Sequence, residues 1–167
     1  MNTKMIPSIF TLANLLLGVV SLIYTLNDEW QLAATMILIG TVLDGMDGKL
    51  ARRLDAASPF GKELDSLCDL VSFGVAPALL AYAYKLVAWP YFGMAVALGF
   101  ALCGAIRLAR FNVLNISDYF VGVPITAAGS IVAIMVLVAQ RIPDLAFPIG
   151  MVILAYLMVS KIKVKKY

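Results

Sequence analysis

The sequence predicts an all-α protein: a polytopic membrane bundle of six transmembrane helices, with the N- and C-termini cytoplasmic. Of its 167 residues, 62% are hydrophobic and only 14% are charged, and the mean hydropathy is +0.94. A soluble domain is nearer half apolar and a quarter charged. The apolar residues fall into six segments, each long enough to cross a hydrocarbon core of about 30 Å. We therefore expect one membrane domain over residues 1–167.

The predicted spans share an apolar composition and end at polar or proline-containing breaks. They cover approximately residues 6–26, 32–53, 61–87, 91–110, 122–140 and 145–160.

Each break has a local reason. The first span is too long for a signal-peptide core, so we expect it to be retained. The second turns polar at Asp44 and continues as a helix to Arg53. A short connector containing Pro59 makes the third span its antiparallel neighbour. Aromatic residues at 89–91, which suit the headgroup level, precede the fourth span.

The last two spans follow polar breaks. Residues 112–121 read as a polar loop before the fifth span, with a short interfacial helix as an alternative. Arg141, Pro143 and Asp144 turn the chain before the sixth. The closing KIKVKKY is most simply a stop-transfer anchor that also favours anionic lipid.

The basic residues predict the orientation in the cell membrane. With the N-terminus in the cytoplasm, only Lys85 and Arg141 of the thirteen basic residues lie outside. The positive-inside rule favours this arrangement. The other eleven are Lys4, Lys49, Arg52, Arg53, Lys62, Arg107, Arg110, Lys161, Lys163, Lys165 and Lys166.

Composition also excludes several kinds of site. Histidine is absent, so acid–base chemistry must use carboxylates, lysines or tyrosines. Cys68 and Cys103 lie in apolar segments without metal-binding spacing and read as buried thiols. No basic face is interleaved with exposed aromatics, so we expect no nucleic-acid partner.

Four aspartates gather where apolar sequence meets polar sequence. Asp44 and Asp47 are three residues apart and share a helix face, and Asp65 and Asp69 are one turn apart on the next span. Converging carboxylates at partial membrane depth repel one another unless cations neutralise them. Oxygen ligands without Cys or His favour magnesium, manganese or calcium over zinc. We therefore predict a metal site, with two ions sharing the four carboxylates.

The small residues beside the aspartates can be interpreted in two ways. Gly48, Ala51 and Gly61 leave room for a flat group to approach the backbone, or they let the spans pack closely. A metal-ion transporter is another way to use intramembrane aspartates, but it is expected to place them near the midplane of several spans. A purely structural membrane subunit has no need of them.

The residues between 44 and 69 carry a resemblance. The pattern Asp44-x2-Asp47-Gly48-x2-Ala51-Arg52-x8-Gly61-x3-Asp65-x3-Asp69 resembles the complete signature of the CDP-alcohol phosphotransferase family. Four further segments resemble its phosphatidylserine synthase branch of archaea and Gram-positive bacteria: TLANLLLG (11–18), SLCDLVSFGVAPA (66–78), GAIRLARFN (104–112) and FVGVPITAAG (120–129).

The resemblance implies a six-span, usually dimeric enzyme. It implies transfer of a phosphatidyl or archaetidyl group from CDP-diacylglycerol or CDP-archaeol to L-serine, with release of CMP, in phospholipid biosynthesis. Glycerol 3-phosphate or inositol phosphate is the alternative acceptor.

The same resemblance implies roles for the signature residues. Asp44, Asp47 and Asp65 are expected to hold one Mg²⁺ or Mn²⁺ ion, and Asp44, Asp65 and Asp69 to hold or approach a second. Asp69 is the expected catalytic base for the acceptor hydroxyl. Gly48, Ala51 and Gly61 are expected to accommodate cytidine, and Arg52 to contact phosphate.

Acceptor-binding residues are predicted near the cytoplasmic end of the fourth span. Arg107 and Arg110 lie one turn apart, and two guanidinium groups there suit a serine carboxylate or a donor phosphate. Their alternative role is to anchor the span at the headgroups. Lys62 and Asn112 complete the predicted acceptor or phosphate set.

Overall fold

Six helical rods form the described part of the chain. The computed structural model describes residues 6–53, 58–114, 119–160 and 163–165, with side chains placed in residues 9–46, 58–113 and 122–160. The third rod is continuous and contains a π-helical turn, η2. The rods are α1 (Ile6–Leu26), α2 (Trp30–Arg53), α3 (Pro59–Asp69) with η2 (Leu70–Val75) and α4 (Ala76–Tyr84), α5 (Pro90–Leu114), α6 (Ile125–Leu137) and α7 (Ala146–Val159).

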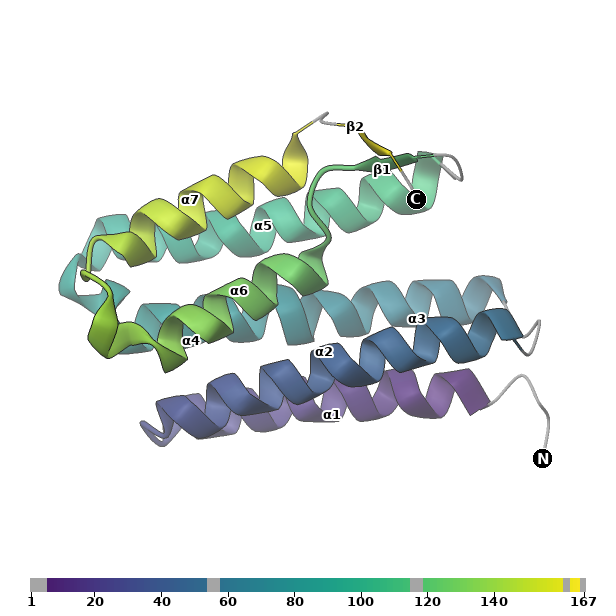
Figure 1. Cartoon of the computed structure of the whole chain (residues 1–167), viewed down its shortest axis with the longest axis horizontal. Helices are drawn as coiled ribbons and strands as arrows, with labels where there is room; N and C mark the ends of the chain where they lie inside the picture. Colours follow the sequence, from purple (N-terminus) through teal and green to yellow (C-terminus); the bar gives the residue numbers. More distant parts are fainter. Residues whose placement is uncertain (1–5, 54–57, 115–118, 161–162, 166–167) are drawn as a thin grey trace.

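The rods pack as three pairs. Figure 1 shows α1 alongside α2 at the bottom, α5 alongside α7 at the top, and the α3–α4 rod with α6 between them. Buried aromatic side chains fill the interior, and Phe73, Phe100 and Phe147 are fully buried. The outward faces carry exposed aliphatic residues such as Leu16 and Leu102, as expected for helices surrounded by lipid.

The prediction of an all-α, six-helix bundle is confirmed, but two predicted lengths are wrong. Three helical stretches are long and apolar enough to cross a membrane, and they cover residues 9–26, 59–84 and 90–113. By contrast, α6 has 13 residues and α7 has 14, well short of about 20. A tight turn delays the start of α6, because Gly122 has a positive φ of 73° and Pro124 caps the helix.

The predicted polar loop at 112–121 is also shorter than expected. α5 continues to Leu114, and residues 119–121 form a strand, β1 (Tyr119–Val121). This strand pairs antiparallel with β2 (Lys163–Lys165), in the segment predicted to be a C-terminal anchor. This two-stranded sheet is the departure from an all-helical structure among the described residues.

The start of α1, the end of α2, the start of α3 and the end of α5 all lie at the same end of the bundle, together with the β1–β2 pair (Figure 1). At the other end, Lys85 donates a hydrogen bond of 2.6 Å to Asp144 and so joins the α4–α5 and α6–α7 turns. The arrangement agrees with an even number of spans. Which end faces the cytoplasm stays a prediction.

Candidate active site

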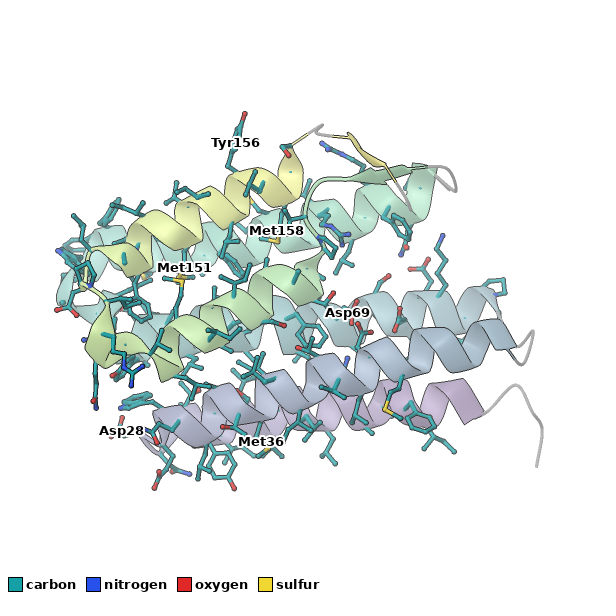
Figure 2. All side chains as sticks on the ribbon, viewed as in Figure 1. Asp28, Met36, Asp69, Met151, Tyr156 and Met158 are labelled. Atoms are coloured by element: carbon teal, nitrogen blue, oxygen red, sulfur yellow. The ribbon has the colours of Figure 1, made fainter. Side chains whose placement is uncertain are left out.

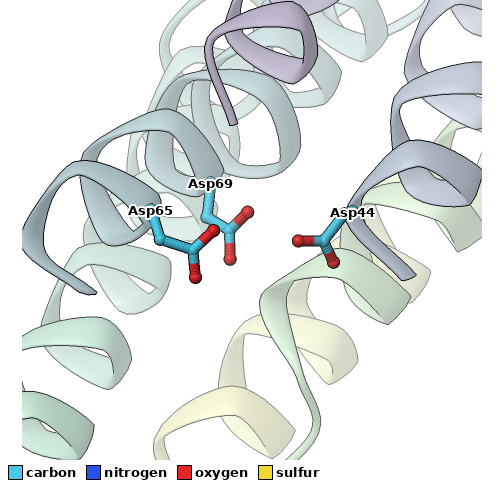
Figure 3. Close-up of side chains that lie close together, drawn as sticks. All are labelled: Asp44, Asp65 and Asp69. Atoms are coloured by element: carbon cyan, nitrogen blue, oxygen red, sulfur yellow. The ribbon is translucent and has the colours of Figure 1, made fainter. Parts of the chain in front are cut away.

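Three of the four predicted aspartates meet between α2 and α3. Asp44, Asp65 and Asp69 are half-buried, and each offers a carboxylate oxygen within 4.8 Å of the others. Figure 3 shows Asp44 reaching across from one helix toward Asp65 and Asp69 on the other. In Figure 2, Asp69 lies inside the bundle, far from Asp28 at the opposite end. The structure therefore brings residues from two separate helices to one point.

Local sequence fixes where α3 begins. Ser58 is the N-cap residue, and its hydroxyl accepts a hydrogen bond of 3.0 Å from the Gly61 backbone N–H. Pro59 occupies the first turn, where its missing N–H leaves no intrahelical bond unmade. With the start fixed, the four-residue spacing puts Asp65 and Asp69 on one face. Gly61 thus lies one turn before Asp65, in the first turn of α3.

The π-helical turn η2 follows Asp69 directly and is held from two sides. On the α1 side, the Ser72 hydroxyl donates a 3.0 Å hydrogen bond to the Asn14 carbonyl. On the α6 side, a Cβ at Gly129 would lie 2.5 Å from the Phe73 carbonyl oxygen, so only glycine allows this approach. Such turns widen a helix locally and often lie at functional sites. These contacts fix the rod, and with it the direction of Asp69.

The aspartate cluster has the chemistry of a site for a hard divalent cation. Three carboxylates from two helices leave a high density of negative charge in a partly desolvated place, which a bound cation offsets. All candidate ligands are oxygens, the donors that Mg²⁺ and Mn²⁺ prefer. Four predicted residues, Asp47, Gly48, Ala51 and Arg52, lie on the α2 backbone, and their side chains lie outside the described residues.

The two predicted arginines of α5 have different surroundings. Arg107 is half-buried, and Asp69 attracts its guanidinium group electrostatically. Its Nε is buried and has no hydrogen-bond acceptor among the side chains and backbone that are described. Arg110 instead donates a 2.9 Å hydrogen bond from Nη1 to the Val159 carbonyl at the end of α7. Arg107 is therefore close enough to Asp69 for their charges to interact, although burial of the guanidinium group is the larger effect on its charge, whereas Arg110 donates to the end of a neighbouring helix.

The other two predicted residues, Lys62 and Asn112, contact each other. Lys62 Nζ lies 3.5 Å from the Asn112 carbonyl oxygen and 5.8 Å from the centroid of the Phe111 ring. The Asn112 amide contacts Glu63 and Ser66, which the sequence did not single out. The partners are more than 40 positions apart in the chain, so no local pattern connects them.

Comparisons with known proteins identify the family of this chain. The sequence profile described as CDP-alcohol phosphatidyltransferase matches residues 4–161. A Helicobacter pylori protein named CDP-diacylglycerol–serine O-phosphatidyltransferase is 40% identical over 166 residues, covering 94% of this chain and 70% of the relative.

Two further relatives carry the same name. The Bacillus subtilis protein is 40% identical over 159 residues, covering 95% of this chain and 88% of its own length. The Methanocaldococcus jannaschii protein is 37% identical over 158 residues, covering 94% of this chain and 72% of its own length. The match spans nearly the whole chain and includes both helices that supply the aspartates. This protein therefore belongs to the CDP-alcohol phosphatidyltransferase family.

Proposed function

We propose that this protein is a CDP-diacylglycerol–serine O-phosphatidyltransferase. It transfers the phosphatidyl group, or the archaetidyl group of CDP-archaeol, to L-serine and releases CMP. The observation that carries this proposal is the Asp44–Asp65–Asp69 cluster, with the half-buried Arg107 near enough to interact electrostatically with Asp69. The names of the relatives support the choice of serine. A single membrane domain over residues 1–167 carries the activity, and the resemblance to the family implies a homodimer.

The aspartates are assigned to divalent metal ions. Asp44, Asp47, Asp65 and Asp69 would hold two ions, Mg²⁺ or Mn²⁺, in the same region that receives the CDP pyrophosphate. When bound, the ions supply positive charge that neutralises the pyrophosphate oxygens and the charge developing on CMP. Gly48, Ala51 and Gly61 leave room for cytidine, and Arg52 is assigned to a phosphate.

The chemical step is a displacement at phosphorus. The serine hydroxyl oxygen forms a bond to the lipid-linked phosphorus, and the bond from that phosphorus to the CMP oxygen breaks. CMP leaves with the electron pair, and Asp69 accepts the hydroxyl proton. A carboxylate is a weak base for an alcohol, so the proton moves late, when the attacking oxygen has become acidic.

Arg107 is assigned to the serine carboxylate. Its buried Nε needs an acceptor, because an unpaired buried donor destabilises the protein. A carboxylate matches the fork of a guanidinium group. Arg110 and Lys62 donate to backbone carbonyls, which directs these two cations away from an acceptor phosphate in this arrangement. This favours serine over glycerol 3-phosphate or inositol phosphate.

Release of CMP from CDP-lipid by the purified protein tests the proposal. With Mn²⁺ and CDP-diacylglycerol or CDP-archaeol, we expect serine to release CMP and to become lipid-linked. Glycerol 3-phosphate and inositol phosphate serve as matched acceptors at the same concentration. If one of them releases CMP and serine does not, the acceptor is misassigned and only the family membership remains.

We also propose that the active site opens at the cytoplasmic face. The start of α1, the end of α2, the start of α3 and the end of α5 lie at one end of the bundle (Figure 1), Asp69 lies nearer to that end than Asp28 does (Figure 2), and most basic residues are in the segments at that end. In a variant without Cys68 and Cys103, we expect a cysteine in the 54–57 connector to react from the cytoplasmic side. A cysteine at Trp89 should react only from outside. The reverse labelling pattern would overturn the assigned topology.

A further inference from the structure

A polar cluster joins the beginning of α3 to the end of α5. The Asn112 amide nitrogen Nδ2 lies 3.0 Å from the Ser66 hydroxyl and 3.3 Å from both carboxylate oxygens of Glu63. The Lys62 ammonium group lies 3.5 Å from the Asn112 backbone carbonyl. Thus Asn112 contacts residues on both sides of Asp65 in the sequence of α3.

The distances in this cluster indicate which groups donate and which accept each hydrogen bond. The Ser66 hydroxyl lies 3.1 Å from the Lys62 carbonyl and 3.4 Å from Asn112 Oδ1. Its single proton goes to the nearer carbonyl, so its oxygen is an acceptor for Asn112. One Nδ2 proton is then donated to Ser66 and the other to the Glu63 carboxylate. Both protons of the amide are used, and a carboxylate at this position could supply neither.

The cluster connects two elements of the proposed active site. The short helix α3 carries Asp65 and Asp69, and α5 carries Arg107 slightly more than one turn before Asn112. Side chains that hydrogen-bond across two helices reduce the freedom of one helix to slide or rotate against the other. We propose that Asn112 is a positioning residue: it holds Asp65 and Asp69 in place relative to Arg107, instead of binding the acceptor itself. This inference rests on the proposed function of those three residues.

Reversing the hydrogen-bond polarity tests the inference. Asn112→Asp removes both donated protons and puts a second carboxylate beside Glu63. We expect Mn²⁺ binding to weaken by about threefold despite the added negative charge, which by itself favours a cation. The effect should be smaller than the about 10- to 100-fold of a direct partner of a metal ligand, because Asn112 acts through the placement of α3. Adding Glu63→Gln supplies an amide donor from the α3 side, so the double variant should recover most of the affinity. Mn²⁺ titration followed by electron paramagnetic resonance measures this without turnover.

Two further variants complete the experiment. Asn27→Asp makes the same chemical change in the exposed α1–α2 turn at the far end and should bind Mn²⁺ as the wild type does. Ser66→Ala removes the hydroxyl that accepts from Asn112 and introduces no new charge, so it should also weaken Mn²⁺ binding. It replaces Asn112→Asp as the test if that variant is too unstable to purify. Thermal unfolding midpoints identify the folded variants.

The kinetic parameters distinguish positioning from direct binding. If Asn112→Asp raises only the serine KM, with unchanged Mn²⁺ affinity and no rescue by Glu63→Gln, Asn112 binds the acceptor and the inference is wrong. Unchanged Mn²⁺ affinity and kinetics in both Asn112→Asp and Ser66→Ala would also overturn it. Failure of the wild type to use serine would contradict the proposed function alone, because the Mn²⁺ titration does not depend on the acceptor.

Discussion

Each of the single substitutions Asp44→Asn, Asp65→Asn and Asp69→Asn should reduce the rate of CMP release by a factor on the order of 10²–10³ or more. Asparagine keeps the size of the side chain but removes its charge. The three carboxylate oxygens lie within 4.8 Å of one another, so each variant removes one member of a shared ligand set. The signature predicts the same loss for Asp47→Asn. Initial rates of CMP release at saturating serine and CDP-lipid measure the effect.

The mechanism of the loss is tested by metal binding. The inactive variants should show weaker Mn²⁺ binding while keeping the unfolding midpoint of the wild-type protein without metal. Removing a negative charge from a crowded cluster relieves repulsion, so these proteins are expected to fold. Chelation with EDTA should abolish wild-type turnover, and added Mn²⁺ or Mg²⁺ should restore it.

Asp28 provides a matched control. It is exposed in the turn at the opposite end of the bundle (Figure 2), where its φ of 61° suits asparagine as well as aspartate. Asp28→Asn should therefore leave turnover and Mn²⁺ affinity at wild-type values. Full activity in EDTA, or in any variant of the cluster, would contradict the assignment of metal ions to these aspartates.

Arg107→Lys should raise the serine KM by about 10- to 100-fold, equivalent to about 1.4–2.8 kcal/mol. Lysine keeps the positive charge but cannot form the two parallel hydrogen bonds of a guanidinium group. The carboxylate of serine is the group expected to use that fork. The KM for CDP-lipid should change much less, because the donor is assigned to the metal ions and to the signature residues of α2.

Arg110→Lys is the corresponding control one turn away. The guanidinium group of Arg110 donates to the Val159 carbonyl, so its main contribution is to the end of α7. We expect Arg110→Lys to lower the unfolding midpoint slightly and to keep the serine KM. Wild-type serine kinetics in both variants would mean that the two arginines anchor the helix at the headgroups. If Arg110→Lys alone raises the serine KM strongly, Arg110 binds the serine carboxylate and Arg107 has the structural role.

The local pattern of the sequence was enough to predict the six helices and the main acidic cluster. Apolar length depends only on neighbouring residues, and the helical period puts Asp65 and Asp69 on one face whatever the rest of the chain does. The short connector then makes α2 and α3 neighbours, which brings Asp44 to the same place. Both α6 and α7 fall short of the crossing length. For α6, hydropathy does not detect that Gly122 and Pro124 delay the start of the helix, whereas α7 begins and ends within one residue of its predicted span.

The contacts between distant segments required the tertiary structure. Arg107 and Arg110 are equivalent in the sequence, one turn apart on an apolar helix, and packing alone turns one toward Asp69 and the other toward Val159. Likewise, Asn112 meets Ser66 across 46 positions only because α3 and α5 are neighbours. Hydropathy and helical period are properties of a segment, whereas the direction of a polar side chain between helices depends on the surfaces that pack around it. The sequence by itself therefore determined the helical fold and the clustering of the aspartates, and the tertiary structure decided which partners the basic and amide side chains contact.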